Sequence, residues 1–153
     1  MPAARDSILI SGFTMDDFPS VHALWQRAGL WMRPSDGPEA TALKLERDPE
    51  LFLVARDGGG VIVGTVMGGW DGRRAYVYHL AVLPERVRRG IGSRLMDELE
   101  QRLRASGALK IKLQILTDNA ASRAFFEQRG YLYEIDCEPW GKELVEGGAP
   151  PCQ

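Results

Sequence analysis

The sequence predicts an α/β (α+β) fold, in which a mixed sheet of about six or seven strands is flanked by about four helices. Two observations support this prediction. The middle of the chain alternates apolar stretches with short turn signals, whereas the flanking stretches repeat apolar residues at helical spacing. The 153 residues suffice for one domain with its own core. We therefore expect a single domain over residues 1–153, with a loose Gly/Pro-rich tail at about 146–153.

The predicted strands are apolar or alternating stretches that are bounded by turn residues. They are residues 7–13, 51–56, 61–70, 74–83, 110–116, 131–137 and 140–145. A run of glycines at 58–60 separates the second and third strands. Because no helix follows this run, we interpret it as a hairpin turn and not as a phosphate-binding loop. Asp71-Gly72 predicts a second hairpin turn, so the middle third reads as an antiparallel meander.

Helices are predicted where apolar residues recur every three or four positions. They follow Thr14, span 39–47, follow Gly92, and span 120–129. The third is the most regular, because its apolar residues recur every four positions at Ile91, Leu95, Leu99 and Leu103. The strand–helix–strand passage around this helix is long enough for a right-handed parallel crossover. The sheet is therefore expected to be mixed.

Composition and charge exclude several classes of protein. With 19 basic and 21 acidic residues the net charge is −2, which argues against nucleic acid as a partner. No apolar run approaches the 20 or so residues of a membrane span, and no signal-peptide pattern opens the chain. Cys137 and Cys152 lack metal or redox spacing. We therefore expect a cytoplasmic protein with reduced thiols, no membrane partner and no metal.

The stretch from Leu80 to Gly92 is the one that indicates chemistry. A strand leads into a basic loop, then Gly-Ile-Gly, then a helix, and a helix start offers unpaired N–H groups to an anion. The arginines around it are Arg86, Arg88, Arg89 and Arg94. We interpret the stretch as a phosphate or pyrophosphate site, although the arginines could equally form a solvated face. A dinucleotide site is less favoured, because Leu95 stands where the third glycine would be.

Two segments resemble a known family. Residues 80–84 (LAVLP) with 89–95 (RGIGSRL) resemble motif A of the GNAT acyltransferase superfamily, and residues 119–131 (NAASRAFFEQRGY) resemble its motif B. Residues 51–55 and 63–72 are similar to the bacterial YpeA-like subgroup, and the whole resemblance covers about residues 7–145.

The resemblance implies a GNAT fold with a splayed parallel strand pair at the cofactor site. It implies an N-acetyltransferase that uses acetyl-CoA as cosubstrate and moves the acetyl group to a primary amine of a small molecule or peptide. Because no motif supplies a covalent nucleophile, we expect direct transfer in a ternary complex. A homodimer is compatible with this prediction.

The resemblance also implies which residues contact the cofactor. The pantetheine arm would pair with the strand edge at Leu80, Ala81 and Val82. The pyrophosphate would lie on the loop and helix start. The loop and helix-start residues that would contact the pyrophosphate are Arg88, Arg89, Gly90, Ile91, Gly92 and Ser93. Asn119 and Phe126 would contact the cofactor from motif B, although Asn119 also reads as a helix cap.

The usual acid and base of one family branch are absent. Phe126 stands where family members often place a proton-donating Tyr, and Gln114 stands where the ribosomal-protein branch has a Glu base. The remaining catalytic candidates are Tyr78 and His79, because an imidazole ordinarily titrates near neutrality. Simple strand alternation would put these two on opposite faces, so only one could face the substrate. The alternative function is a non-catalytic module that binds or senses acyl-CoA.

Overall fold

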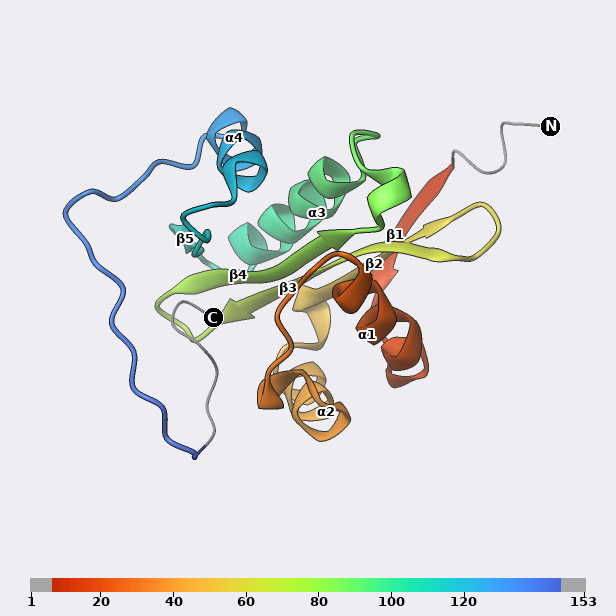
Figure 1. Cartoon of the computed structure of the whole chain (residues 1–153), viewed down its shortest axis with the longest axis horizontal. Helices are drawn as coiled ribbons and strands as arrows, with labels where there is room; N and C mark the ends of the chain where they lie inside the picture. Colours follow the sequence, from red (N-terminus) through yellow and green to blue (C-terminus); the bar gives the residue numbers. More distant parts are fainter. Residues whose placement is uncertain (1–6, 147–153) are drawn as a thin grey trace. The chain divides into compact units, whose positions relative to one another are not determined.

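The computed structural model describes residues 7–146 (Figure 1). The chain forms two compact units. The first unit ends at Lys112 and holds the sheet, and the second begins at Leu113 and holds helix α4 (Ala120–Gln128). Among residues 7–146, no helix is long and apolar enough to cross a membrane.

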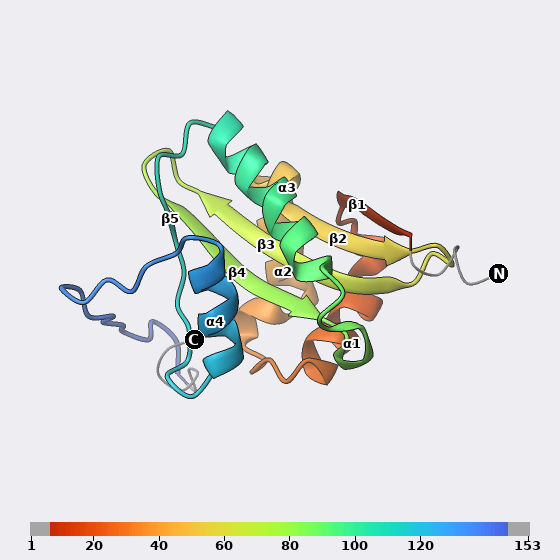
Figure 2. The ribbon, with the colours of Figure 1, turned by 90° about the horizontal axis from the view of Figure 1, so that it is seen from above.

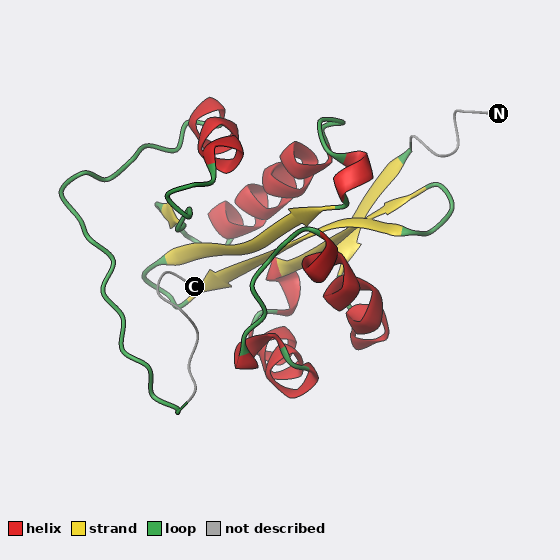
Figure 3. Cartoon of the chain, in the orientation of Figure 1, coloured by secondary structure: helices red, strands yellow, loops and turns green. Residues whose placement is uncertain are grey.

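The sheet of the first unit has five strands in the order β1-β2-β3-β4-β5 (Figure 3). Neighbours are antiparallel through β4, and β5 is parallel to β4, so the prediction of a mixed sheet is confirmed. The strands are β1 (Ile8–Gly12), β2 (Phe52–Asp57), β3 (Ile62–Trp70), β4 (Ala75–Val82) and β5 (Ile111–Lys112). Both predicted hairpin turns lie between the strands that they were expected to join.

Helices cover both faces of the sheet. Helices α1 (Phe18–Arg27) and α2 (Pro38–Arg47) lie on one face, and α3 (Ile91–Ala105) crosses the other (Figures 1 and 2). The apolar stripe of α3 is fully buried against the sheet. It approaches so closely that a Cβ on Gly68 of β3 would lie 2.6 Å from the Leu99 side chain, so a larger residue there would force Leu99 to move.

A β-bulge interrupts the pairing of β3 with β4. Met67 lies opposite Tyr78 and Thr65 opposite Ala81, so Val66 alone faces two residues of β4. One of these two, His79, has φ of 49°, which is the left-handed region. The extra residue resets the alternation of side chains along β4. The expectation that Tyr78 and His79 point to opposite faces is therefore wrong, as their contacts below show.

The predicted count of six or seven strands is also wrong. Of the predicted strand at 110–116 only Ile111–Lys112 pairs, and residues 131–137 and 140–145 form no strand. The backbone there makes local bonds instead, for example from the Tyr131 N–H to the Phe126 carbonyl. Alternation favours an extended chain but does not supply a neighbouring strand to pair with. The predicted tail at 146–153 lies outside the described residues except for Glu146.

Candidate active site

The loop before α3 is built to expose backbone N–H groups. Arg88 and Gly90 both have positive φ, 62° and 78°, and Gly90 is the N-cap of α3 with no side chain capping the helix. The first bond within the helix runs from the Arg94 N–H to the Gly90 carbonyl, 3.1 Å. The N–H groups of Ile91 and Gly92 therefore have no acceptor inside the helix. Left-handed residues before a helix turn successive N–H groups toward one point, which can bind an anion.

Two ion pairs brace this loop against the rest of the first unit. Arg86 Nη2 lies 2.6 Å from Asp57 Oδ2 at the β2–β3 turn, and Arg27 Nη2 lies 2.8 Å from Glu85 Oε2. The backbone N–H groups of Val61 and Gly59, together with Arg86, lower the pKa of Asp57. The glycine turn therefore supports the loop by way of Asp57.

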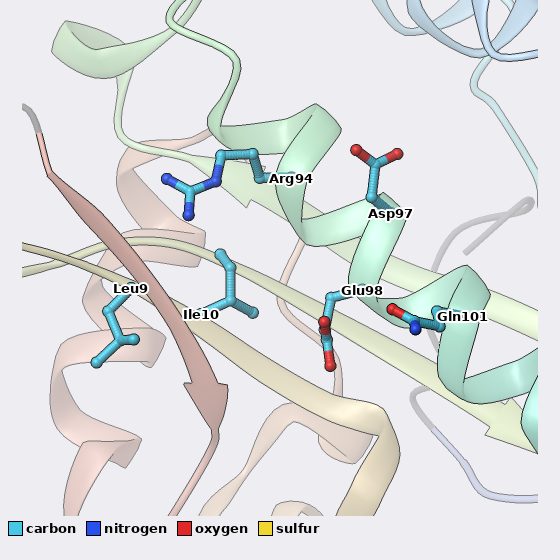
Figure 4. Close-up of a pocket in the computed structure, with 6 residues that line it drawn as sticks. All are labelled: Leu9, Ile10, Arg94, Asp97, Glu98 and Gln101. Atoms are coloured by element: carbon cyan, nitrogen blue, oxygen red, sulfur yellow. The ribbon is translucent and has the colours of Figure 1, made fainter.

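The arginines around the loop do not act as one group. Arg88 and Arg89 are exposed on the loop itself, whereas Arg86 is engaged by Asp57. Arg94 extends toward a hollow between β1 and α3 (Figure 4). This hollow is lined by Leu9, Ile10, Arg94, Asp97, Glu98 and Gln101. None of the candidate catalytic residues lines it, so we place the chemistry elsewhere.

Strand β4 has an open edge where the cofactor arm was expected. Its pairing with β5 consists of Ala75 opposite Ile111 and Tyr76 opposite Lys112. Within residues 7–146, no strand pairs with the remaining part of that edge, which includes Leu80, Ala81 and Val82. The parallel pair thus parts after two residues, and β4 runs on alone toward the loop before α3.

His79 contacts a buried carboxylate. Its Nε2 lies 2.7 Å from Asp36 Oδ1, and its ring meets the buried Trp25 of α1 edge-on, with ring centroids 4.9 Å apart. Asp36 is only 4% exposed, and its Oδ2 accepts a hydrogen bond of 2.9 Å from the Arg33 N–H. Burial raises the pKa of Asp36, but the hydrogen bonds from His79 and Arg33 and the nearby positive charge outweigh it and lower that pKa. Asp36 is therefore ionised at neutral pH.

Tyr78 lies on the same face of the sheet as His79. It stacks on Tyr76, with centroids 6.1 Å apart, and a Cβ on Gly69 would touch both the Tyr78 ring and Lys44 of α2. Burial raises the pKa of Tyr78, and the negative charges of nearby Asp48 and Asp71 add to this. The phenol therefore keeps its proton at neutral pH. Of the two candidates, His79 suits a base and Tyr78 suits a proton donor.

The second unit holds the motif B residues. Asn119 caps α4, because its Oδ1 accepts a hydrogen bond of 3.0 Å from the Ser122 N–H, which confirms the cap interpretation. Phe126 is 7% exposed and meets Phe125 and Tyr131 edge-on. Gln114 is exposed. The first unit thus brings together the strand edge, the loop and His79, and the second unit places Asn119 and Phe126 on one helix.

The sequence analysis did not single out Asp36, which lies outside every predicted helix and strand. The signal was present, because Arg33-Pro34-Ser35-Asp36 has an acidic residue three positions after the turn start, the spacing of a capping turn. No such spacing reveals the partner, which lies 43 positions away. Within residues 7–146, no cluster of His, Cys, Asp and Glu could hold a metal ion.

Comparisons with known proteins agree with this geometry. The family model described as "Acetyltransferase (GNAT) family" matches residues 18–131. An acetyltransferase of Pectobacterium atrosepticum is 44% identical over 135 residues, which are 88% of this chain and 94% of the relative. An acetyltransferase of Sodalis glossinidius is 42% identical over 135 residues, which are again 88% of this chain and 94% of the relative.

Solved structures show the same fold. Ard1 from Thermoplasma volcanium matches with a TM-score of 0.72 and 25% identity over 82% of each chain. The PaiA N-acetyltransferase of Thermoplasma acidophilum, solved in complex with coenzyme A, matches with a TM-score of 0.73 and 19% identity over 80% of this chain and 88% of the other. Since the family model and two relatives with more than 40% identity each cover most of the sequence, the chain belongs to the GNAT acetyltransferase family.

Proposed function

We propose that this protein moves an acetyl group from acetyl-CoA to a primary amine by direct transfer in a ternary complex, with His79 as the proton acceptor. The observation that carries this proposal is the contact of His79 with the ionised Asp36, on the strand that leads into the anion-binding loop. An imidazole held by a carboxylate is a common arrangement for a general base. We expect the two units to act together as one acyltransferase domain.

The backbone of the first unit supports binding of acetyl-CoA. The N–H groups from Arg88 to Ser93 would hold its diphosphate, and the open edge at Leu80, Ala81 and Val82 would pair with the amides of its pantetheine arm. Asn119 and Phe126 would contact the arm from α4. When bound, acetyl-CoA supplies the thioester carbon that the acceptor amine attacks, and its thiolate is the leaving group.

His79 and Tyr78 would divide the proton transfers. An amine that arrives as an ammonium must lose a proton before its nitrogen has a lone pair, and His79 would take that proton. Tyr78 keeps its phenolic proton at neutral pH, because its pKa is raised. We therefore propose Tyr78 as the proton donor to the thiolate. Phe126 cannot fill this role, because it has no hydroxyl group.

The test begins with binding. CoA should raise the melting temperature of the full chain by mass action, and NAD should do much less, because the loop lacks the third glycine of a dinucleotide site. Equal shifts with both ligands, or no shift with CoA, would refute the acyl-CoA proposal.

The second step measures transfer. Release of free thiol from acetyl-CoA is followed with a panel of amines: a polyamine, an amino sugar, free amino acids and peptides with free N-termini. At least one acceptor should give turnover that His79→Gln removes and that His22→Gln, a change in the other histidine, leaves in place. CoA binding with no turnover on any amine would favour the non-catalytic module. This module is the second candidate because Phe126 and Gln114 replace the acid and base of one family branch.

The finer assignments are further proposals. The similarity to the YpeA-like subgroup and the cytoplasmic location stay predictions, as does the acceptor, whether a small molecule or a peptide. A homodimer would be tested by sedimentation of the full chain with and without CoA.

A further inference from the structure

We propose that Asp36 is a positioning residue that holds the proton of His79 on Nε2, so that Nδ1 is the nitrogen that accepts the proton from the acceptor amine. The role in the reaction rests on the proposed function of His79. The assignment of the proton can be measured with no substrate at all, so the two can fail separately.

The assignment follows from what each group can donate. A carboxylate has oxygens that only accept, so the hydrogen between Asp36 Oδ1 and His79 Nε2 must belong to the imidazole. A neutral imidazole carries one N–H, and if that hydrogen is on Nε2 then Nδ1 carries the lone pair. Within residues 7–146, no hydrogen bond to Nδ1 competes for that lone pair.

The carboxylate of Asp36 cannot rotate away from this contact at low cost. Its Oδ2 is occupied by the Arg33 N–H at 2.9 Å, and the Asp36 N–H donates back to the Arg33 carbonyl at 2.9 Å. One oxygen therefore serves the backbone and the other serves the imidazole. The edge-on contact with Trp25 holds the ring from α1. Asp36 and Trp25 together thus fix both the tautomer and the orientation of His79.

The left-handed backbone of His79 belongs to the same arrangement. A residue other than glycine rarely adopts φ of 49°, and in this chain the bulge imposes it. Without the extra residue, strand alternation would turn one of Tyr78 and His79 to the α3 face. The bulge therefore presents both side chains to the α1–α2 side, where Asp36 lies.

A matched carboxylate elsewhere supplies the control. Asp17 lies in an equivalent turn, accepts a hydrogen bond of 3.0 Å from the Thr14 N–H, and contacts Arg56 Nη2 at 2.7 Å in place of an imidazole. Asp17→Asn therefore makes the same chemical change in the same local structure, away from His79.

Asp36→Asn should reverse the tautomer. The Arg33 N–H needs an oxygen, so the amide oxygen takes the place of Oδ2 and the amide NH2 faces His79. That NH2 can only donate, so Nε2 becomes the acceptor and the ring proton moves to Nδ1. The nitrogen that should take the substrate proton is then blocked. We expect kcat/KM to fall about 100-fold or more, with CoA affinity unchanged.

The experiment is NMR of the full chain with 13C,15N-labelled histidine. The chain has only two histidines, so His22→Gln assigns both signals. Wild type and Asp17→Asn should show the Nε2–H tautomer at His79, and Asp36→Asn should show Nδ1–H. An Nδ1–H tautomer in wild type overturns the proposal, and this spectrum decides even if Asp36→Asn does not fold.

Activity measurements then separate the positioning role of Asp36 from the proposed function of His79. A reversed tautomer with unchanged kcat/KM would overturn the positioning role of Asp36. Full activity of His79→Gln would instead overturn the proposed function of His79 while leaving the tautomer assignment in place. A reversed tautomer with lost turnover, and neither effect in Asp17→Asn, supports the proposal.

Discussion

Two short turns of the first unit have the same local structure and different partners. In each, an acidic residue accepts a hydrogen bond from the backbone N–H three positions earlier, at 3.0 Å for Asp17 and 2.9 Å for Asp36. Each carboxylate is buried, and the pKa of each is lowered against the effect of burial. Asp17 contacts Arg56 of β2, whereas Asp36 contacts His79 of β4.

The difference lies in what the partner can do. A guanidinium stays protonated at every relevant pH, so the Asp17–Arg56 pair can only join α1 to the sheet. An imidazole can carry or release a proton, so we propose that the same carboxylate geometry has a chemical use where His79 faces it. Local structure therefore explains how each carboxylate is held, and the long-range partner explains what it is for.

The largest expected effect is on turnover when the imidazole is removed. His79→Gln should lower kcat/KM at least about 100-fold, because no other described side chain of this face places an imidazole against a carboxylate. CoA affinity should stay the same, since the loop at 88–93 is unchanged. Steady-state kinetics and a CoA titration measure the two. If His79→Gln kept turnover within twofold of wild type, the Asp36 turn would have no more catalytic use than the Asp17 turn.

The complementary change is to the partner of Asp17. Arg56→Met should lower the free energy of unfolding by about 1–3 kcal/mol, because it removes the ion-pair partner of a buried carboxylate and leaves only the bonds from the Thr14 N–H and hydroxyl. Turnover should be unchanged at a temperature where the variant is folded. Urea unfolding and kinetics test this pair of expectations. A loss of turnover without a loss of stability would mean that the Asp17 turn is functional as well.

The cofactor loop should be separable from both turns. Gly92→Val places a side chain at the second residue of α3, against the helix start that would hold the diphosphate, and should raise the Kd for CoA about tenfold, or about 1.4 kcal/mol. Gly12→Val is the control, because a Cβ at Gly12 meets nothing within 4 Å. The His79 tautomer should be unchanged in both. Normal CoA binding by folded Gly92→Val would place the diphosphate elsewhere.

Much of this architecture could be predicted from local sequence. The four-residue repeat of α3 and the turn residues of the hairpins each specify an element through neighbours in sequence, and those elements lie where they were expected. The basic loop and the two glycines also predicted where α3 begins, and the anion site at that helix start stays a prediction.

The remainder depends on pairings that local sequence does not contain. The bulge at His79 follows from the register of β3 against β4, and the contact with Asp36 joins residues 43 positions apart. The stretch at 131–145 has a strand-like pattern, yet Leu132, Tyr133, Ile135 and Trp140 are exposed and unpaired as strand residues. A pattern can favour extension, but only a neighbouring strand completes its hydrogen bonds.

The smallest expected effect is on the pH dependence of stability, in which the Asp17 and Asp36 turns should behave alike. The pKa values of Asp17 and Asp36 are lowered in the folded state, so on acidification the unfolded chain takes up protons first. Their stabilisation is thus complete above the unfolded value near 3.9, and is lost as pH falls through the folded value. Asparagine does not titrate, so Asp17→Asn and Asp36→Asn should each lose less stability than wild type between neutral pH and about pH 3.5.

Urea unfolding at a series of pH values measures this difference, with each variant compared with its own stability at pH 7. Part of the acid sensitivity should persist in both variants, because the pKa values of Asp57, Asp71 and Glu85 are lowered as well. The two asparagine variants should match each other in acid although only Asp36→Asn loses turnover. If Asp36→Asn were more acid-sensitive than wild type while Asp17→Asn was not, the pKa of Asp36 would be raised in the folded protein, and its carboxyl group could carry a proton there. The proton between it and His79 could then belong to either group.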